Sequence, residues 1–140
     1  MHILKVISVF LFIFSLQNCA TKSNQNFECK NFKTGKFELI NSEENRKYII
    51  ERNTKIQIEK IFELSTNKKL KEDRYYEIVW ENDCEYQLKL DTLKSKFDYN
   101  DLKINSMGGL QNKIIKIDKK CAEIQTTFQN LIANSKICKK

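Results

Sequence analysis

The stretch YYEIVWENDCEYQLKL, residues 75–90, carries the pattern that decides the fold class. Apolar, aromatic or cysteine residues occupy every second position on either side of Asn82-Asp83: Tyr76, Ile78 and Trp80 before it, and Cys84, Tyr86, Leu88 and Leu90 after it. Side chains of a strand point to alternate faces of a sheet, so a period of two indicates strands with one buried face. The stretch therefore predicts a hairpin of an antiparallel sheet.

The loop of this hairpin must have an odd number of residues. A two-residue loop at Asn82-Asp83 would pair Trp80 with Glu85 and would put the two apolar sets on opposite faces, because paired residues share a face. Asn and Asp tolerate the left-handed conformation that a three-residue turn needs. We therefore predict an odd-length turn or a bulge at residues 82–84. It gives three pairs: Trp80–Tyr86, Ile78–Leu88 and Tyr76–Leu90.

The same period of two recurs along most of the chain. Further short strands are predicted at residues 35–39, 47–52, 56–64, 102–107, 113–117 and 121–128. In this part of the chain Ile56, Ile58, Phe62 and Leu64 share one face, which Lys60 interrupts. The other face carries Lys55, Gln57 and Glu59. Residues 91–100 are predicted as a loop, Gly108-Gly109 as the end of the strand before it, and residues 131–137 as a strand or a helical turn. The segment 121–128 is expected to pair with 113–117 across residues 118–120.

These segments predict an all-β fold, a small antiparallel β-sandwich or barrel-like meander of about eight strands. No helical period persists beyond the first twenty residues. The domain is expected to span residues 27–140, a length that suits one domain with a modest core.

The first twenty residues, MHILKVISVFLFIFSLQNCA, have the features of an export signal. Lys5 precedes an apolar run from Val6 to Leu16, which is too short to span a bilayer as a helix. The run ends in Leu16-Gln17-Asn18-Cys19, which resembles the lipobox of bacterial lipoproteins, although Asn18 is larger than the small residue usual there. We predict a signal-peptide helix over residues 1–18 and lipid on Cys19. An ordinary signal peptide cut after Ala20 and an uncleaved anchor are the alternatives.

Residues 19–26 are then the lipidated cysteine and a polar tether. Two acyl chains suffice to hold a protein on a membrane. No acidic cluster follows Cys19, which favours the outer membrane, facing the periplasm, over the cell surface. The net charge of +7 comes from scattered lysines and not from a stripe, so no nucleic-acid partner is expected.

The chain contains five cysteines. If Cys19 carries lipid, Cys29, Cys84, Cys121 and Cys138 remain, and in an oxidising compartment they form two disulfides with three connectivities to choose from. We favour Cys29–Cys84 with Cys121–Cys138. No C-x-x-C spacing occurs and the one histidine, His2, lies in the signal peptide, so we expect no metal site and no cofactor.

One further pattern extends from Cys29 to about Leu90. Cys29-x5-Gly35-x-Phe37, Ile50-x-Arg52, Gln57-x-Glu59 and Trp80-x3-Cys84-x-Tyr86-x-Leu88 resemble, in order and spacing, a family of small flavobacterial lipoproteins of the Bacteroidetes, often labelled "DNA topoisomerase IV". The resemblance implies a compact β domain with paired cysteines at Cys29 and Cys84. It carries no established activity, and the region of Cys121 and Cys138 departs from it.

Topoisomerase activity is rejected, because a single small exported domain with no nucleotide-binding loop cannot cleave and rejoin DNA. Without histidine after the signal peptide, no Ser-His or Cys-His nucleophile can be built. Three glycines cannot make a phosphate-binding loop. A pair of carboxylates could still hydrolyse a glycosidic bond, but no pair stands out among 18 acidic residues. We therefore expect no enzyme.

A group of polar and aromatic residues suggests a ligand pocket. Its candidate members lie on adjacent predicted strands: Arg52, Gln57, Glu59, Tyr76, Trp80 and Tyr86. They would bind a small amphiphile at a sheet face or barrel mouth. The alternative, which we favour, is an exposed Arg–Glu pair beside an aromatic core, since such pairs are common and contribute little.

The sequence thus predicts a lipid-anchored protein of the cell envelope that acts as a non-catalytic binding or structural module. Its partners would be the membrane, through Cys19, and an envelope protein or a small hydrophobic ligand. A lipocalin-like carrier and a secreted hydrolase are the alternatives. A lumen filled by Trp80, Tyr86 and Ile78 would argue against the carrier, and a cleft with two facing carboxylates would favour the hydrolase.

Overall fold

The hairpin predicted from residues 75–90 is present with the predicted register. In the computed structural model, which describes residues 25–140, β4 (Arg74–Trp80) is antiparallel to β5 (Glu85–Leu90). Backbone N–H groups of Glu81 and Asn82 donate to the carbonyl of Glu85, which leaves residues 82–84 as an odd-length turn. The cross-strand pairs are Tyr76–Leu90, Ile78–Leu88 and Trp80–Tyr86.

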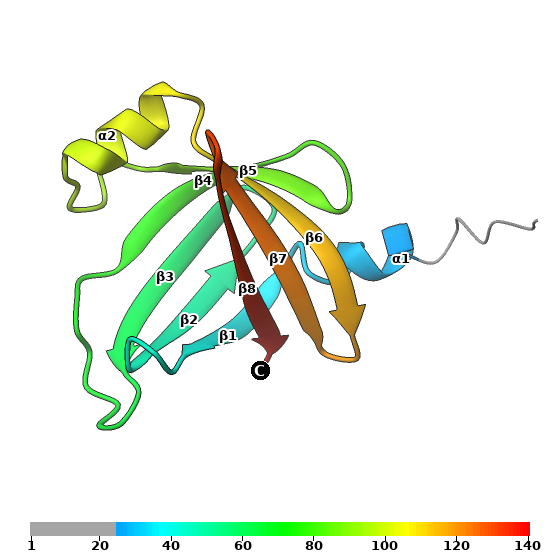
Figure 1. The fold of residues 1–140 in the computed structure, drawn as a ribbon, viewed down its shortest axis with the longest axis horizontal. Helices are drawn as coiled ribbons and strands as arrows, with labels where there is room; N and C mark the ends of the chain where they lie inside the picture. The colour runs from blue at the N-terminus through cyan, green and yellow to red at the C-terminus, as the bar shows by residue number, and fades with distance from the viewer. Residues whose placement is uncertain (1–24) are drawn as a thin grey trace, which may run out of the picture.

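Eight strands follow one another as an up-and-down meander, and the last closes on the first to form a barrel (Figure 1). The remaining strands are β1 (Gly35–Asn41), β2 (Arg46–Arg52), β3 (Ile56–Glu63), β6 (Leu110–Asp118), β7 (Cys121–Phe128) and β8 (Leu131–Lys139). The predicted all-β class is confirmed, as a barrel and not a sandwich. The expected signal-peptide helix and Cys19 lie outside the described residues.

Two short helices lie at opposite ends of the barrel (Figure 1). We define the α1 end as the end that carries α1 (Gln25–Lys30), the turns at 53–55, 81–84 and 119–120, and the C-terminus. The α2 end carries α2 (Tyr99–Ser106), the turns at 42–45 and 129–130, and the loop at 64–73. The described chain therefore begins and finishes at the α1 end.

The α1 end is closed by a packed core. Cys29 is 1% exposed and Phe32 is 2% exposed, and the Phe32 ring stacks on Phe37 with 5.7 Å between ring centroids. Cys29 belongs to α1 and Phe32 to the turn after it, so residues 25–34 plug this end of the barrel. The buried residues around the plug are Ile50, Ile78, Tyr86, Leu88, Ile114, Ala122, Ile124 and Ile137.

Both favoured disulfides are confirmed. Cys29–Cys84 joins α1 to the turn between β4 and β5, and Cys121–Cys138 joins β7 to β8. The expected pairing of residues 121–128 with 113–117 is also present, with a bulge between Ile114 and Lys116. Residues 131–137, predicted as a strand or a helical turn, belong to the strand β8.

The strand predicted at residues 102–107 is wrong, because this segment belongs to α2. The Asp98 side chain accepts from the N–H of Asp101, and the Asp101 side chain accepts from the N–H of Asp98; together they form a capping box. This helix buries no residue, which explains why its apolar positions show no helical period. The Asn105 side chain instead attaches it to β5, with bonds of 2.9 and 2.8 Å to the N–H and carbonyl of Leu90.

The apolar side of residues 56–64 does not face the core. Phe37 pairs with Ile50, and Ile50 pairs with Glu59, so Gln57, Glu59 and Ile61 point into the barrel. Ile56, which we expected on the buried side with Ile58, Phe62 and Leu64, is exposed. The hydrophobic period alone misassigned this strand, because its inward polar groups have partners on other strands.

Candidate functional site

A chain of hydrogen bonds crosses the inside of the barrel between its two ends. It starts at Arg52, the last residue of β2, which is 6% exposed and lies opposite Gln57 in the β2–β3 register. The turn between these strands is held by the Asn53 side chain, which accepts from the N–H groups of Lys55 and Ile56. This Asx-type turn sets the register that brings Arg52 and Gln57 together.

All three nitrogens of the Arg52 guanidinium donate hydrogen bonds. Nε donates to Gln57 Oε1 at 2.8 Å, one terminal nitrogen donates to the Phe32 carbonyl at 3.0 Å, and the other to the Tyr86 hydroxyl at 3.1 Å. The guanidinium also lies 4.6 Å from the centroid of the Tyr86 ring. A buried cation requires such partners, because leaving water without them is costly.

Glu59 continues the chain on the next inward position of β3. Gln57 Nε2 donates to Glu59 Oε1 at 2.8 Å. Burial raises the pKa of the Glu59 carboxyl, against the lowering effects of the bonds from Gln57 and Tyr76 and the positive charges of Arg74 and Arg52. Glu59 therefore holds its proton to a higher pH than an exposed glutamate does.

Arg74 connects this interior chain to α2. Its Nε donates to the Tyr76 hydroxyl at 2.9 Å, and its Nη2 forms a 2.6 Å ion pair with Asp101 Oδ1. Burial, followed by the negative charge of Glu59, raises the pKa of the Tyr76 hydroxyl. The connected groups thus carry two arginines and two carboxyls, which balance in charge when both carboxyls are ionised.

The structure brings the six predicted pocket residues together. Five of them belong to the chain of hydrogen bonds, and Trp80 packs against it, with 4.5 Å between its ring centroid and that of Tyr86. The exposed Arg–Glu pair that we favoured is wrong, because Arg52 is buried and each nitrogen of its guanidinium donates a hydrogen bond inside the barrel. A role in ligand binding for these residues stays a prediction.

Sequence reasoning missed Arg74 and Asp101. Arg74 lies opposite Glu59 in the β3–β4 register and shares its face with Tyr76, so the alternation of β4 could have placed it inside. The sequence signal for Asp101 was its spacing of three from Asp98, which is typical of a capping box.

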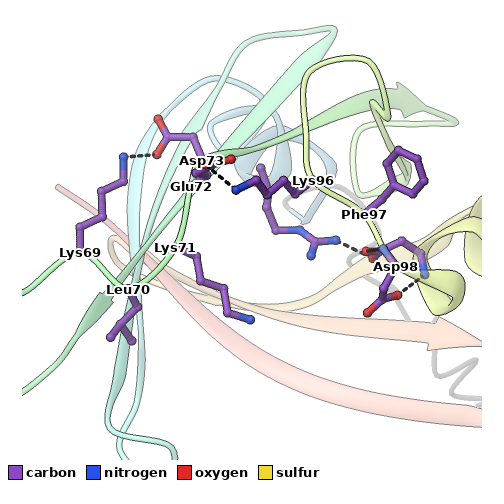
Figure 2. A pocket seen from close by; sticks show the side chains of 10 residues that line it. Lys69, Leu70, Lys71, Glu72, Asp73, Lys96, Phe97 and Asp98 are labelled. Atoms are coloured by element: carbon purple, nitrogen blue, oxygen red, sulfur yellow. Dashed lines mark hydrogen bonds and ion pairs between the residues drawn. The ribbon is translucent and has the colours of Figure 1, made fainter.

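A pocket of about 610 Å³ lies at the α2 end (Figure 2). Arg74 and Asp101, which form the ion pair, are among the residues that line it. Its walls are the loop 69–74 on one side and residues 96–98 with Asp101 on the other. Leu70 and Phe97 supply apolar surface. Its volume lies within the range of small-molecule sites, roughly 300–1,000 Å³.

The carboxylates of this pocket all have structural partners. Lys69 pairs with Asp73 at 2.7 Å, and Lys96 with Glu72 at 2.8 Å (Figure 2). Asp101 pairs with Arg74, and Asp98 caps α2. The acidic groups thus serve ion pairs and a helix cap.

Large apolar side chains are exposed on the elements of the α2 end. Tyr99 is 79% exposed and Leu131 is 71% exposed, and the Gln129 side chain contacts the Met107 sulfur, which joins the β7–β8 turn to the end of α2. The remaining members of this group are Leu93, Phe97, Leu102 and Met107. Exposed apolar side chains gathered at one end of the barrel make that end a candidate interaction site.

Within residues 25–140, no three His, Cys, Asp or Glu side chains gather as metal ligands would. Nor does any helix in that range have the length and apolarity to cross a membrane. Comparison with family models, curated proteins and solved structures finds no match for this chain. The resemblance to flavobacterial lipoproteins therefore stays a prediction.

Proposed function

We propose that this protein is a lipid-anchored, non-catalytic binding module of the cell envelope, held to the outer membrane through Cys19 and facing the periplasm. Its α2 end would bind another envelope protein. The observation that carries the proposal is the separation of the two ends. The chain enters at the plugged α1 end, whereas the exposed apolar side chains and the 610 Å³ pocket lie at the α2 end.

This separation suits an anchored binding module. Gln25 is the sixth residue after Cys19, so lipid on Cys19 would keep the α1 end close to the bilayer. The α2 end would then point away from the membrane, where a partner can reach it. Burying the apolar side chains at this end would supply the hydrophobic core that protein interfaces have.

The anchor is tested by replacing Cys19. Cys19→Ser should move the protein from the membrane fraction to the soluble fraction, because no acyl chain can then be attached. A Cys19→Ser protein that stays membrane-bound and uncleaved would mean that residues 1–18 act as the anchor.

The binding surface is tested by photocrosslinking in cells. A photoreactive amino acid at Tyr99 should give a discrete crosslinked product that Phe97→Ser abolishes. The matched control is the same label at Val79, which is 48% exposed on the outer wall of β4, and it should give none. Equal labelling from Val79, or no product from Tyr99, would contradict the α2 end as the binding surface.

A carrier of a small hydrophobic ligand is the second candidate, supported by the volume of the pocket. Ile78 and Tyr86 belong to the core inside the barrel and Trp80 packs against it, which argues against a ligand in the lumen. The ligand would instead lie at the mouth, against Leu70 and Phe97. The naphthalene dye 1-anilinonaphthalene-8-sulfonate should then bind with one saturable site that Leu70→Asp removes. Non-saturable dye binding, unchanged by Leu70→Asp, would count against the carrier.

A further inference from the structure

The barrel is closed unevenly where its last strand meets its first. β8 pairs with β7 over eight positions, from Leu131 to Cys138, but with β1 over only two, Phe37–Lys139 and Glu38–Cys138. Beyond these pairs β1 stays with β2, and β8 stays with β7 (Figure 1). One edge of β8 from Leu131 to Lys136 therefore has no partner strand among the described residues.

Because backbone groups alternate in direction along a strand, two hydrogen bonds near the end of β8 identify which of its groups face the open edge. Lys139 donates its N–H to Lys120, beside β7, and Lys140 donates its N–H to Lys36 of β1. Successive residues of a strand direct their backbone groups to opposite neighbours. The N–H and carbonyl groups of Ile132, Asn134 and Lys136 therefore point to the open edge, whereas those of Ala133 and Ser135 bond to β7.

The side chains along this edge are also uncovered. Residues 131–134 are all exposed, although strand side chains alternate between the two faces of the sheet. The inward-pointing Ala133 is thus open to solvent together with the outward-pointing Ile132, which is 64% exposed. Leu131, part of the exposed apolar group at the α2 end, begins the same edge, so the two surfaces are continuous.

We propose that an extended segment of the partner protein adds to the open edge of β8 as a further strand. Only an extended chain presents N–H and carbonyl groups at the spacing that satisfies those of Ile132, Asn134 and Lys136, and strand addition is a common mode of peptide recognition. This inference rests on the proposed binding role of the α2 end and names the kind of contact it makes.

The side chains along the open edge of β8 indicate which residues the partner segment should contain. Leu131, Ile132 and Ala133 favour apolar side chains opposite them. Lys136 is exposed, and no carboxylate of residues 25–140 forms an ion pair with it, so it favours an acidic residue. The partner segment is therefore extended, apolar at one end and acidic at the other.

The open edge is tested first in the purified protein alone. Amide hydrogens of Ile132, Asn134 and Lys136 should exchange with solvent at least tenfold faster than those of Ala133 and Ser135, as measured by nuclear magnetic resonance. Equal protection of the two sets would overturn the proposal, because it would mean that the edge already has a partner.

Strand addition is tested with the synthetic peptide acetyl-TVTVEVTE-amide. The peptide should slow exchange of the Ile132, Asn134 and Lys136 amides, and a version methylated on alternate backbone nitrogens should not. Asn134→Pro removes a donor at the open edge but no bond to β7, so the fold should survive while peptide protection is lost. Ala133→Pro is the contrast, because it breaks a bond to β7 and should lower stability.

The outcomes separate this inference from the proposed function. A Tyr99 crosslink that persists in Asn134→Pro would overturn strand addition and leave the α2 end as the binding surface. Peptide protection without a Tyr99 crosslink would support strand addition and contradict the proposed function. A dimer in solution that Asn134→Pro dissociates would overturn the partner segment, since a second copy would then occupy the edge.

Discussion

Arg52 is the residue on which three distant parts of the chain converge. Its guanidinium bonds to the carbonyl of Phe32 in the plug, to Gln57 on β3 and to the hydroxyl of Tyr86 on β5. Phe32, Gln57 and Tyr86 are buried, and removing the guanidinium would take from each the hydrogen bond that its oxygen accepts from Arg52. The residue thus couples the plug to the barrel wall.

Arg52→Ala should lower the free energy of unfolding by about 3 kcal/mol or more, because it leaves buried polar groups unpaired and a cavity beside them. Urea denaturation followed by circular dichroism measures the change. The control is Arg46→Ala, at a half-exposed arginine of β2, which should change stability by about 0.5 kcal/mol or less. Equal effects of the two substitutions would mean that the interior bonds contribute nothing specific.

Glu59 makes stability depend on pH. Its carboxyl has a pKa above the ordinary 4.5, so the folded protein binds this proton more tightly than the unfolded chain does. Its contribution to stability is complete below pH 4.5 and is lost as the pH rises through the folded-state pKa. Carboxylates whose pKa is lowered, such as Glu51, Asp83 and Glu85, act in the opposite direction.

Comparison with Glu59→Gln isolates this effect, since the other carboxylates are common to both proteins. The stability of the natural protein minus that of the variant should fall as the pH rises from 4 to 8. Urea midpoints at several pH values give this difference. A difference that stays constant or rises with pH would mean that the folded-state pKa of Glu59 is not raised.

At the scale of elements, the two disulfides restrain different parts of the barrel. Cys29–Cys84 closes a separation of 55 residues and holds the α1 plug, whereas Cys121–Cys138 closes 17 residues within a hairpin that is already paired along its length. The first therefore constrains the unfolded chain more, and of these two disulfides it is the one that joins α1 to the barrel.

The double variant Cys29→Ser/Cys84→Ser should lose about 4 kcal/mol of unfolding free energy, and Cys121→Ser/Cys138→Ser about 3 kcal/mol, by the chain-entropy relation. Denaturant unfolding without reductant measures both. The first variant should also expose the segment around Phe32 to protease. A larger loss from the second pair would contradict this ranking.

The helix α2 is held to the barrel by polar contacts instead of by a core. Its attachments are the two bonds from Asn105 to Leu90 and the ion pair of Asp101 with Arg74. Asn105→Ala should therefore raise hydrogen exchange in residues 91–109 by tenfold or more and leave the exchange of β6 and β7 nearly unchanged. The control is Ser106→Ala, whose side chain bonds only within the helix. Uniformly faster exchange throughout the barrel would contradict a local role for Asn105.

At the scale of the whole molecule, the two ends of the described chain meet at the α1 end. The N–H of Lys140 donates to the carbonyl of Lys36, at the start of β1, at 3.0 Å. The exposed turn at 42–45 lies at the other end, away from both disulfides. The order of strands around the barrel therefore does not require the chain to enter at β1 and leave at β8.

A circular permutant that joins Lys140 to Gln25 through a flexible linker of about ten residues, and opens the chain between Glu43 and Glu44, should fold with both disulfides. Circular dichroism and mass spectrometry under non-reducing conditions test this. A permutant opened between Gln57 and Ile58, inside β3, should not fold. Failure of the first permutant would mean that the β1–β2 turn is needed to start folding.

The sequence by itself determined the strands of the hairpins and the register of β4 with β5. These follow from local chemistry, since a strand repeats every two residues and an odd loop keeps Trp80 and Tyr86 on one face. The sequence also grouped Arg52, Gln57 and Glu59, because a short turn brings both sides of the β2–β3 hairpin together.

Only the tertiary structure decided how the barrel closes and which polar side chains are buried inside it. Gln57 and Glu59 point inward because residues of other strands stabilise them there. Arg52 donates a hydrogen bond to Gln57. The positive charge of Arg74 and a hydrogen bond from Tyr76 offset the cost of burying Glu59. α2 forms from a capping box and from contacts with Leu90 and Arg74 that no local period reveals. The open edge of β8 depends on where β1 diverges from it, and that pairing joins Phe37 and Glu38 to residues far along the chain, which no local period reveals.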